Sequence, residues 1–322
     1  MRRAVTYGIL VLSLIILYTG CTALGVKNLK LEEVKKKYTD SHSRFVNIDG
    51  NIIHYKDEGT GPTLVLVHGV CASLHTWDGW TGELKGKYRV IRMDLPGFGV
   101  TGPVANGQYT LDNYMGIMEK FLKALDVKDF YMAGNSLGGY ISWNFALRHP
   151  DQVKKLILID PVGYRQDMPW LLSLASHPVF RPMVRHMMPR FLLYNAVKQV
   201  YGDKSKVNRT IQDRYFELAM REGNKKAYVG VFAAMREMNH SKNLSTEIKN
   251  IKVPTLLMWG RKDEWIPVKY VKNWQKDLPG ISSIVYEGAG HTPMEEIPVK
   301  TAGDASRFCL GSVKDSGAGA AK

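Results

Sequence analysis

The sequence predicts an α/β fold in which a mostly parallel central sheet has helices on both faces and carries an inserted helical cap. Short apolar runs such as TLVLV are typical of strands buried on both faces. These runs alternate with segments of helical spacing, which indicates crossovers between parallel strands. The alternation stops between residues 162 and 243, where the pattern is helical and shows no strand. With 322 residues, 45% of them hydrophobic, the chain can bury a large core.

These patterns divide the chain into five parts. The N-terminus has the composition of an export segment, and the C-terminus is small and polar. The predicted parts are a signal peptide at 1–20, a flexible tether at 21–43, a core made of 44–161 and 244–310, a helical cap at 162–243 and a flexible tail at 311–322.

The core elements follow one another along the chain. Residues 44–59 predict an antiparallel hairpin, because two strand patterns flank the tight turn Asp49-Gly50. Residues 111–125 predict a helix, because their apolar side chains recur at helical spacing. The other predicted strands are 63–69, 88–93, 130–134, 153–161, 253–260 and 282–288, and the other predicted helices are 136–150, 268–276 and 295–308.

The N-terminus resembles a bacterial lipoprotein signal. Arg2 and Arg3 precede an apolar stretch at 7–18, and Cys21 follows small residues. The resemblance implies that Cys21 is lipidated and becomes the new N-terminus, although Tyr18 stands where such signals usually have leucine. An uncleaved anchor and ordinary secretion are the alternatives, and all three export the domain.

The residue after the cysteine predicts the destination. In Gram-negative lipoproteins a residue other than aspartate at this place implies the outer membrane, and here it is Thr22. We therefore expect a lipid anchor in the bacterial outer membrane, with the domain facing the periplasm or the outside.

The net charge of +14 suggests a nucleic-acid partner, but the distribution of the basic residues along the chain disfavours one. The basic residues are scattered, and the run at 35–37 is short and lacks interleaved aromatic residues. A solvated basic surface is the expected reading, and a basic face near anionic lipid is the alternative.

Cysteine and histidine spacing predicts no metal site and no cofactor. The cysteines other than Cys21 are Cys71 and Cys309, which could pair in an oxidising compartment. No local pattern supports pairing, so we expect two buried free thiols.

Ser136 is the predicted nucleophile. It lies in Gly134-Asn135-Ser136-Leu137-Gly138, where a predicted strand turns sharply into a predicted helix. In this context the pattern is that of a nucleophile elbow, which holds the serine in a strained conformation with its hydroxyl exposed. Larger side chains at the two glycines would collide with the neighbouring strand and helix.

His291 is the predicted base for this serine. It lies in the small-residue loop YEGAGH between the last strand and the last helix. Asp263, just beyond strand 253–260, is the predicted carboxylate that fixes the histidine tautomer. Asp160 ends strand 153–161 and is the competing acid, because that strand end could also reach the histidine.

Other polar residues are assigned to structural roles. Asp94, in DLPGFG, is expected to organise a turn, and Glu264 is expected to point away from the site. His54 has no setting that favours catalysis and is expected at the surface. A surface histidine that caps a helix is the structural alternative for His291.

Serine, aspartate and histidine occur in the chain order of the α/β-hydrolase superfamily, which the sequence resembles from residue 44 to 308. Four motifs carry the resemblance: VHGV, DLPGFG, GNSLGG, and GRKDEWIP followed by GAGH. The resemblance implies an oxyanion hole made of the backbone N–H groups of Val70 and Leu137. It also implies that His68 shapes the loop before Val70.

The predicted activity is hydrolysis of carboxylic esters with apolar acyl or alkyl groups through an acyl-enzyme. Trp170 and Phe191 belong to apolar cap stretches that are expected to line the substrate pocket. One alternative is a hydrolase of carbon–carbon bonds in aromatic-ring breakdown, which GNSLGG also resembles. The export signal argues against it, because such enzymes act on cytosolic intermediates. A non-catalytic binding protein on this fold is the second alternative, disfavoured by the complete triad.

Overall fold

The computed structural model describes residues 24–242 and 244–311. The predicted signal peptide, Cys21 and most of the predicted tail lie outside these residues. Within them, no helix is long and apolar enough to cross a membrane.

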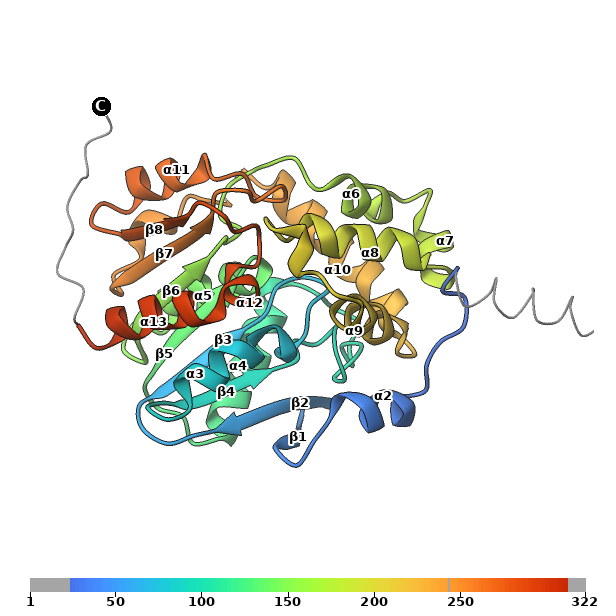
Figure 1. The fold of residues 1–322 in the computed structure, drawn as a ribbon, viewed down its shortest axis with the longest axis horizontal. Coiled ribbons are helices and arrows are strands. Elements are labelled where there is room, and N and C mark those ends of the chain that lie inside the picture. Colours follow the sequence, from blue (N-terminus) through green and yellow to red (C-terminus); the bar gives the residue numbers. More distant parts are fainter. Residues whose placement is uncertain (1–23, 243, 312–322) are drawn as a thin grey trace, which may run out of the picture.

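An eight-stranded mixed sheet forms the centre of the molecule (Figure 1). Its strand order is β1-β2-β4-β3-β5-β6-β7-β8, and only the β1–β2 and β2–β4 pairs are antiparallel. The predicted α/β fold with a mostly parallel sheet is therefore confirmed. The strands are β1 Ser43–Ile48, β2 Asn51–Glu58, β3 Thr63–Val67, β4 Arg89–Met93, β5 Phe130–Asn135, β6 Val153–Ile159, β7 Thr255–Gly260 and β8 Ser282–Tyr286.

Helices cover both faces of this sheet, as the uninterrupted apolar strands predict. In β3, Leu64 and Leu66 belong to one hydrophobic cluster, whereas Val65 and Val67 belong to the cluster on the opposite face. Helices α3, α12 and α13 contribute to the first cluster, and α4, α5 and α11 to the second (Figure 1). These helices are α3 Asp78–Leu84, α4 Leu111–Ala124, α5 Leu137–Arg148, α11 Tyr270–Asp277, α12 Pro293–Glu296 and α13 Pro298–Cys309.

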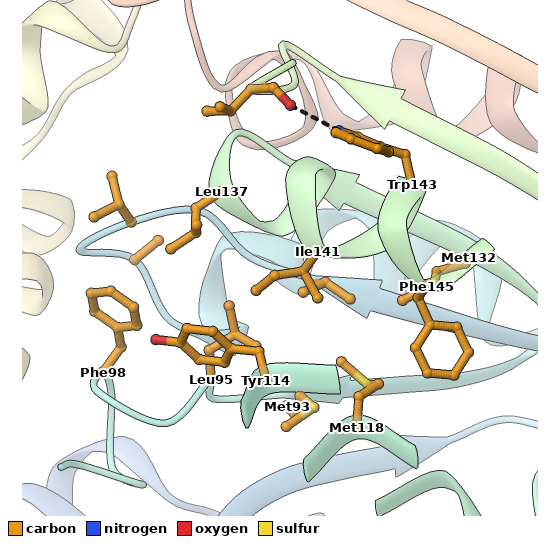
Figure 2. Close-up of a cluster of buried hydrophobic side chains, with 14 of the residues drawn as sticks. Met93, Leu95, Phe98, Tyr114, Met118, Met132, Leu137, Ile141, Trp143 and Phe145 are labelled. Carbon is orange, nitrogen blue, oxygen red and sulfur yellow. Dashed lines mark hydrogen bonds between the residues drawn. The ribbon is translucent and has the colours of Figure 1, made fainter. Parts of the chain in front are cut away.

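Figure 2 shows how tightly α5 is held in the second cluster. Leu137 and Ile141 point toward Tyr114 of α4, while the indole N–H of Trp143 donates to the carbonyl of Val162 at 2.9 Å. This hydrogen bond ties α5 to the first residues beyond β6. The N-terminus of α5, where Ser136 lies, is thus anchored in the core.

The last predicted helix, 295–308, is divided in the structure. Proline cannot donate a backbone hydrogen bond within a helix. Pro298 therefore starts α13, and the four-residue α12 precedes it.

The cap occupies the interval between β6 and β7, where the sequence predicts an insertion. Five α-helices among its described residues form most of it, and Figure 1 shows them gathered on one side of the sheet. They are α6 Trp170–Ser176, α7 Arg181–His186, α8 Arg190–Gln199, α9 Arg209–Met220 and α10 Asn224–His240.

The segment before β1 differs from the predicted flexible tether. Helix α2, Leu31–Tyr38, buries Val34 and Tyr38, which lie one turn apart on the same face. The backbone of Leu29 bonds to Met220 at 2.8 Å and to Glu222 at 2.9 Å. Residues 24–43 are therefore fixed against the cap, because one apolar face of an otherwise charged helix finds a partner there.

Candidate active site

Ser136 lies at a strained turn between β5 and α5. Its backbone angles are φ 56° and ψ −118°, in the positive-φ region that non-glycine residues rarely adopt. A Cβ added at Gly134 would collide with the carbonyl of Gly138, and one at Gly138 would collide with the carbonyl of Val67. The two glycines are required by this close approach of strand and helix, which is the reason the sequence pattern suggests.

His291 and Asp263 form a buried pair. The Nδ1 atom of His291 lies 2.7 Å from Oδ2 of Asp263. The other carboxylate oxygen of Asp263 accepts the backbone N–H groups of Trp265 at 2.7 Å and Ile266 at 2.9 Å. Three donors thus hold the Asp263 carboxylate in one orientation. Glu264 points away, toward Lys204, as expected.

Ser136 and His291 line the same cavity. No hydrogen bond joins them in this structure, and Nε2 of His291 has no partner among the described residues. The free ring nitrogen is the atom that a general base needs for the serine proton, and such hydrogen bonds are often long before a substrate binds. The predicted serine, histidine and aspartate are thus brought to one place.

Val70 and Leu137, the predicted oxyanion donors, flank Ser136. Val70 lines the cavity, and Leu137 is the first residue of α5. The Leu137 side chain points into the core (Figure 2), so only its backbone can face the serine. Among residues 24–242 and 244–311, neither backbone N–H donates a hydrogen bond. Their assignment to an oxyanion hole stays a prediction.

Asp94 and His68 shape the loops beside this site. Asp94 accepts the N–H groups of Leu74 and Val100, each at 2.8 Å. His68 accepts the N–H of Leu95 at 2.9 Å and bonds to the carbonyl of Gly69 at 2.7 Å. Both residues therefore have the structural roles that the sequence indicates.

The expectation for His54 is wrong. His54 is fully buried, and its Nδ1 lies 2.8 Å from Oδ2 of Asp94. Burial raises the pKa of Asp94, but the hydrogen bond and the charge of His54 outweigh it and lower that pKa to about 2. The sequence does not indicate this contact, because the strand pattern around His54 does not reveal which residue of the neighbouring strand lies beside it.

The cavity above Ser136 is apolar. It is partly open to solvent and reaches from the β5–α5 turn into helices α6, α7 and α8. None of the described residues that line it is Lys, Arg, Asp or Glu. Its polar side chains, apart from Ser136 and His291, are Cys71, Asn135, Tyr215, Tyr228, Trp265 and Thr292.

Trp170 and Phe191, the predicted pocket residues, do not line this cavity. Trp170 is 58% exposed and Phe191 is 61% exposed. Their helix neighbours Leu172 and Leu193 are buried and line the cavity instead. The apolar runs in α6 and α8 are too dense for the sequence to reveal which face turns inward.

Cys71 and Cys309 are free thiols, as expected, but only Cys309 is buried, whereas Cys71 is half-buried. Cys71 lines the cavity near Val70, with a backbone φ of 58°. Burial raises the pKa of its thiol above the usual range. A thiolate nucleophile at this position is therefore disfavoured.

Asp160, the competing acid, lies close to both members of this pair. An oxygen of Asp160, an oxygen of Asp263 and a ring nitrogen of His291 all lie within 4.8 Å of one another. Asp263, not Asp160, makes the hydrogen bond to the histidine. The geometry thus favours Asp263 as the acid of the triad and leaves Asp160 without a role in it.

Several known proteins with similar sequences and structures are hydrolases. Over 274 residues the chain is 27% identical to 2-hydroxy-6-oxo-6-(2'-aminophenyl)hexa-2,4-dienoic acid hydrolase of Metapseudomonas resinovorans, covering 84% of this chain and 91% of that protein. It also resembles the crystal structure of a bacterial membrane phospholipase A, with a TM-score of 0.72, 26% identity, and coverage of 97% of this chain and 99% of the other.

A third comparison supports the fold alone. The meta-cleavage product hydrolase CumD superposes with a TM-score of 0.74 at 22% identity, over 83% of this chain and 98% of the other. The family model described as alpha/beta hydrolase fold matches residues 62–298. That match spans strands β3 to β8, the turn at Ser136 and the loop at His291, so the chain belongs to the alpha/beta hydrolase fold family and is a hydrolase.

Proposed function

We propose that this protein is a serine hydrolase that cleaves carboxylic esters with apolar acyl or alkyl groups. The observation that carries the proposal is the cavity. Ser136 and His291, whose Nε2 is unpartnered among the described residues, line it, and its described lining contains no Lys, Arg, Asp or Glu. A neutral, apolar ester matches this lining, because a charged substrate would be buried there without a counter-charge.

In the proposed mechanism, Nε2 of His291 removes the hydroxyl proton as Ser136 Oγ bonds to the ester carbonyl carbon. The negative charge that forms on the carbonyl oxygen is stabilised by the backbone N–H groups of Val70 and Leu137. His291 then protonates the alcohol as its C–O bond breaks, which leaves the acyl group on Ser136. Water, deprotonated by His291, attacks the acyl-enzyme and releases the acid. Asp263 holds the tautomer and stabilises the imidazolium.

A lipid ester is the substrate class that we favour. The cavity extends between cap helices and is lined by leucine, methionine and valine, which suits a hydrocarbon chain. The similar crystal structure that covers 97% of this chain is that of a membrane phospholipase A. Similarity over nearly the whole of both chains supports a related substrate.

A membrane partner is part of the proposal. Met188, next to α7, donates its N–H to the carbonyl of Leu24 at 3.1 Å, so the first described residues lie beside the cap (Figure 1). The surface formed by α6, α7, α8 and the residues beside them carries large exposed apolar side chains, and α7 adds the basic Arg181 and Arg185. The exposed apolar residues of this region are Leu24, Val26, Trp170, Val179, Phe180, Met183 and Phe191.

We propose that lipid on Cys21 anchors the domain in the bacterial outer membrane. Several acyl chains, each contributing roughly 0.8 kcal/mol per buried methylene, would hold the protein almost irreversibly. The wild type is then expected to fractionate with membranes and to resist a high-salt wash. Cys21→Ser is expected to block processing and to leave a longer form. Maturation of the variant to the same mass as the wild type would contradict lipidation and favour ordinary signal cleavage.

Hydrolysis of a carbon–carbon bond is the second candidate, and sequence similarity favours it. The Metapseudomonas relative is named as the hydrolase of a dienoic acid. A dienoic acid carries a carboxylate, which would need a cationic or strongly donating partner in the pocket. No lysine or arginine lines the described cavity, so the site chemistry favours an ester over this substrate.

A chain-length series of p-nitrophenyl esters, run beside a ring-cleavage dienoate, separates the two candidates. We expect release of p-nitrophenol that rises with acyl length and depends on Ser136, and little turnover of the dienoate. Efficient turnover of the dienoate with weak ester hydrolysis would make the second candidate the function. Turnover of neither compound would favour a non-catalytic binding protein.

A further inference from the structure

Asp160 is a buried carboxyl group that the proposed mechanism does not use. It follows β6, has no exposed surface, and adopts a left-handed backbone conformation with φ 45°. Its Oδ1 accepts the N–H of Gly260 at 3.0 Å, whereas Oδ2 is buried and has no partner among the described residues. An unpaired buried oxygen beside another carboxylate needs a physical explanation.

Two carboxylates cannot share this site in their charged forms without a cation. Asp160 faces Asp263 and His291, which lie on the loops after β7 and β8. The other titratable neighbours are Glu296 of α12 and Tyr286 of β8. Within the described residues, no lysine or arginine forms an ion pair with either aspartate. A proton on one of the two carboxyl groups removes the electrostatic repulsion between Asp160 and Asp263.

Hydrogen bonding decides which aspartate carries the proton. Asp263 faces three donors, the N–H groups of Trp265 and Ile266 and the ring of His291, and these stabilise its negative charge. Asp160 accepts only one donor, the N–H of Gly260. The charge therefore stays on Asp263, and the proton belongs on the free oxygen of Asp160.

We propose that Asp160 is a positioning residue that remains a neutral carboxylic acid and donates its proton, through Oδ2, in a hydrogen bond to the Asp263 carboxylate. Burial, together with the charge of Asp263, raises the pKa of Asp160 well above the usual range, in agreement with this assignment. The bond fixes Asp263 from behind. It also draws negative charge away from the side that faces His291, so His291 releases its proton more readily.

This inference rests on the triad proposed above, and two variants test it. Asp160→Asn is the matched control, because its amide can donate to Asp263, accept from Gly260, and tolerate the left-handed backbone. Asp160→Leu has the same branching but can donate nothing. The readout is the acid limb of the pH dependence of kcat/KM, which reports protonation of the free enzyme's base.

For Asp160→Asn we expect kcat/KM within about threefold of wild type and an unmoved acid limb. For Asp160→Leu we expect the limb to move to higher pH, since Asp263 then attracts the imidazolium proton more strongly. If the acid limb of Asp160→Leu lies at the same pH as in wild type, Asp160 contributes only to packing, and the proposal is overturned. A limb that moves in Asp160→Asn by about one unit to lower pH would mean that Asp160 is ionised in the wild type, which also overturns it.

Unfolding measurements provide a readout that does not depend on activity and that decides the question even if Asp160→Leu fails to fold. The folded wild type holds a proton that the unfolded chain releases above the ordinary carboxyl range, so its stability falls as pH rises toward the raised pKa of Asp160. Asparagine has no such proton. The stability of Asp160→Asn relative to wild type should therefore increase between about pH 5 and pH 8 in urea denaturation.

A stability difference that stays constant over this range would overturn the neutral-acid assignment. Failure of the proposed function looks different, because the wild type would then show little ester hydrolysis, or Ser136→Ala would retain it, while the pH-dependent stability difference of Asp160→Asn persisted.

Discussion

The loops at the sheet edge and the cap face the same cavity, but different interactions hold them. In the loops, polar side chains are buried and held by several hydrogen bonds, as Asp263 and Asp94 are. In cap helices α6, α7 and α8, apolar side chains line the cavity, and others, such as Trp170 and Phe191, remain exposed. The difference indicates that the loops fix the chemistry, while the cap sets what the cavity accepts.

Replacement of Ser136 is the strongest way to break this comparison. Ser136→Ala removes the proposed nucleophile without adding volume at the strained turn. We expect ester turnover to fall by about 10⁴-fold or more, with the thermal unfolding temperature close to wild type. More than a tenth of the wild-type activity would contradict the assignment.

Replacement of Asp263 and Asp160, one at a time, distinguishes the roles of the two aspartates within the loops. Asp263→Asn removes the charge that fixes the His291 tautomer, so kcat is expected to fall by about 10³-fold or more. Asp160→Asn should cost far less, because it does not contact the histidine. Comparison of both kcat values against wild type checks this. The reverse order would assign the acid to the end of β6.

Replacement of Asp94 tests whether a buried, hydrogen-bonded charge in these loops stabilises the fold. Its pKa is lowered to about 2, so its charge stabilises the fold above the ordinary carboxyl pKa, and this contribution is lost as pH falls toward about 2. We expect Asp94→Asn to lower the free energy of unfolding at pH 7 by about 2 kcal/mol, with a smaller loss near pH 3. Urea denaturation at both pH values measures this. A loss that does not depend on pH would mean that packing, not charge, is responsible.

Cap substitutions should have the smallest effects, and these should depend on the substrate. Leu172→Ala and Leu193→Ala enlarge the cavity wall, so we expect a several-fold change in the ratio of long-chain to acetate ester hydrolysis. Trp170→Ala and Phe191→Ala are matched controls on the same helices and should leave this ratio unchanged in detergent-free assays with soluble esters. Equal losses on all esters in the leucine variants would indicate a packing role alone.

The sequence predicts the loops better than the cap for a physical reason. Ser136 has a steric signature, because only glycines fit around its turn, and each strand has an apolar run that needs burial on both faces. His291 and Asp263 follow strands whose ends must meet at one sheet edge. In the cap, apolar residues occur on both faces of short helices, so the inward face of α6 was not predictable.

Side-chain contacts between neighbouring strands could not be predicted from the sequence either. His54 and Asp94 are far apart in the chain, and nothing in either motif indicates that they meet. The packing of residues 24–43 on the cap was missed because α2 presents a narrow apolar face in a charged segment.

Trapping of the acyl-enzyme tests the central claim most directly. The protein is mixed with a p-nitrophenyl ester of a long acyl chain, quenched in acid within the first turnovers, and digested for mass spectrometry. We predict an acyl adduct on the peptide that contains Ser136, and no adduct in Ser136→Ala. An adduct on Cys71, or continued ester hydrolysis with Ser136 unmodified, would contradict the account.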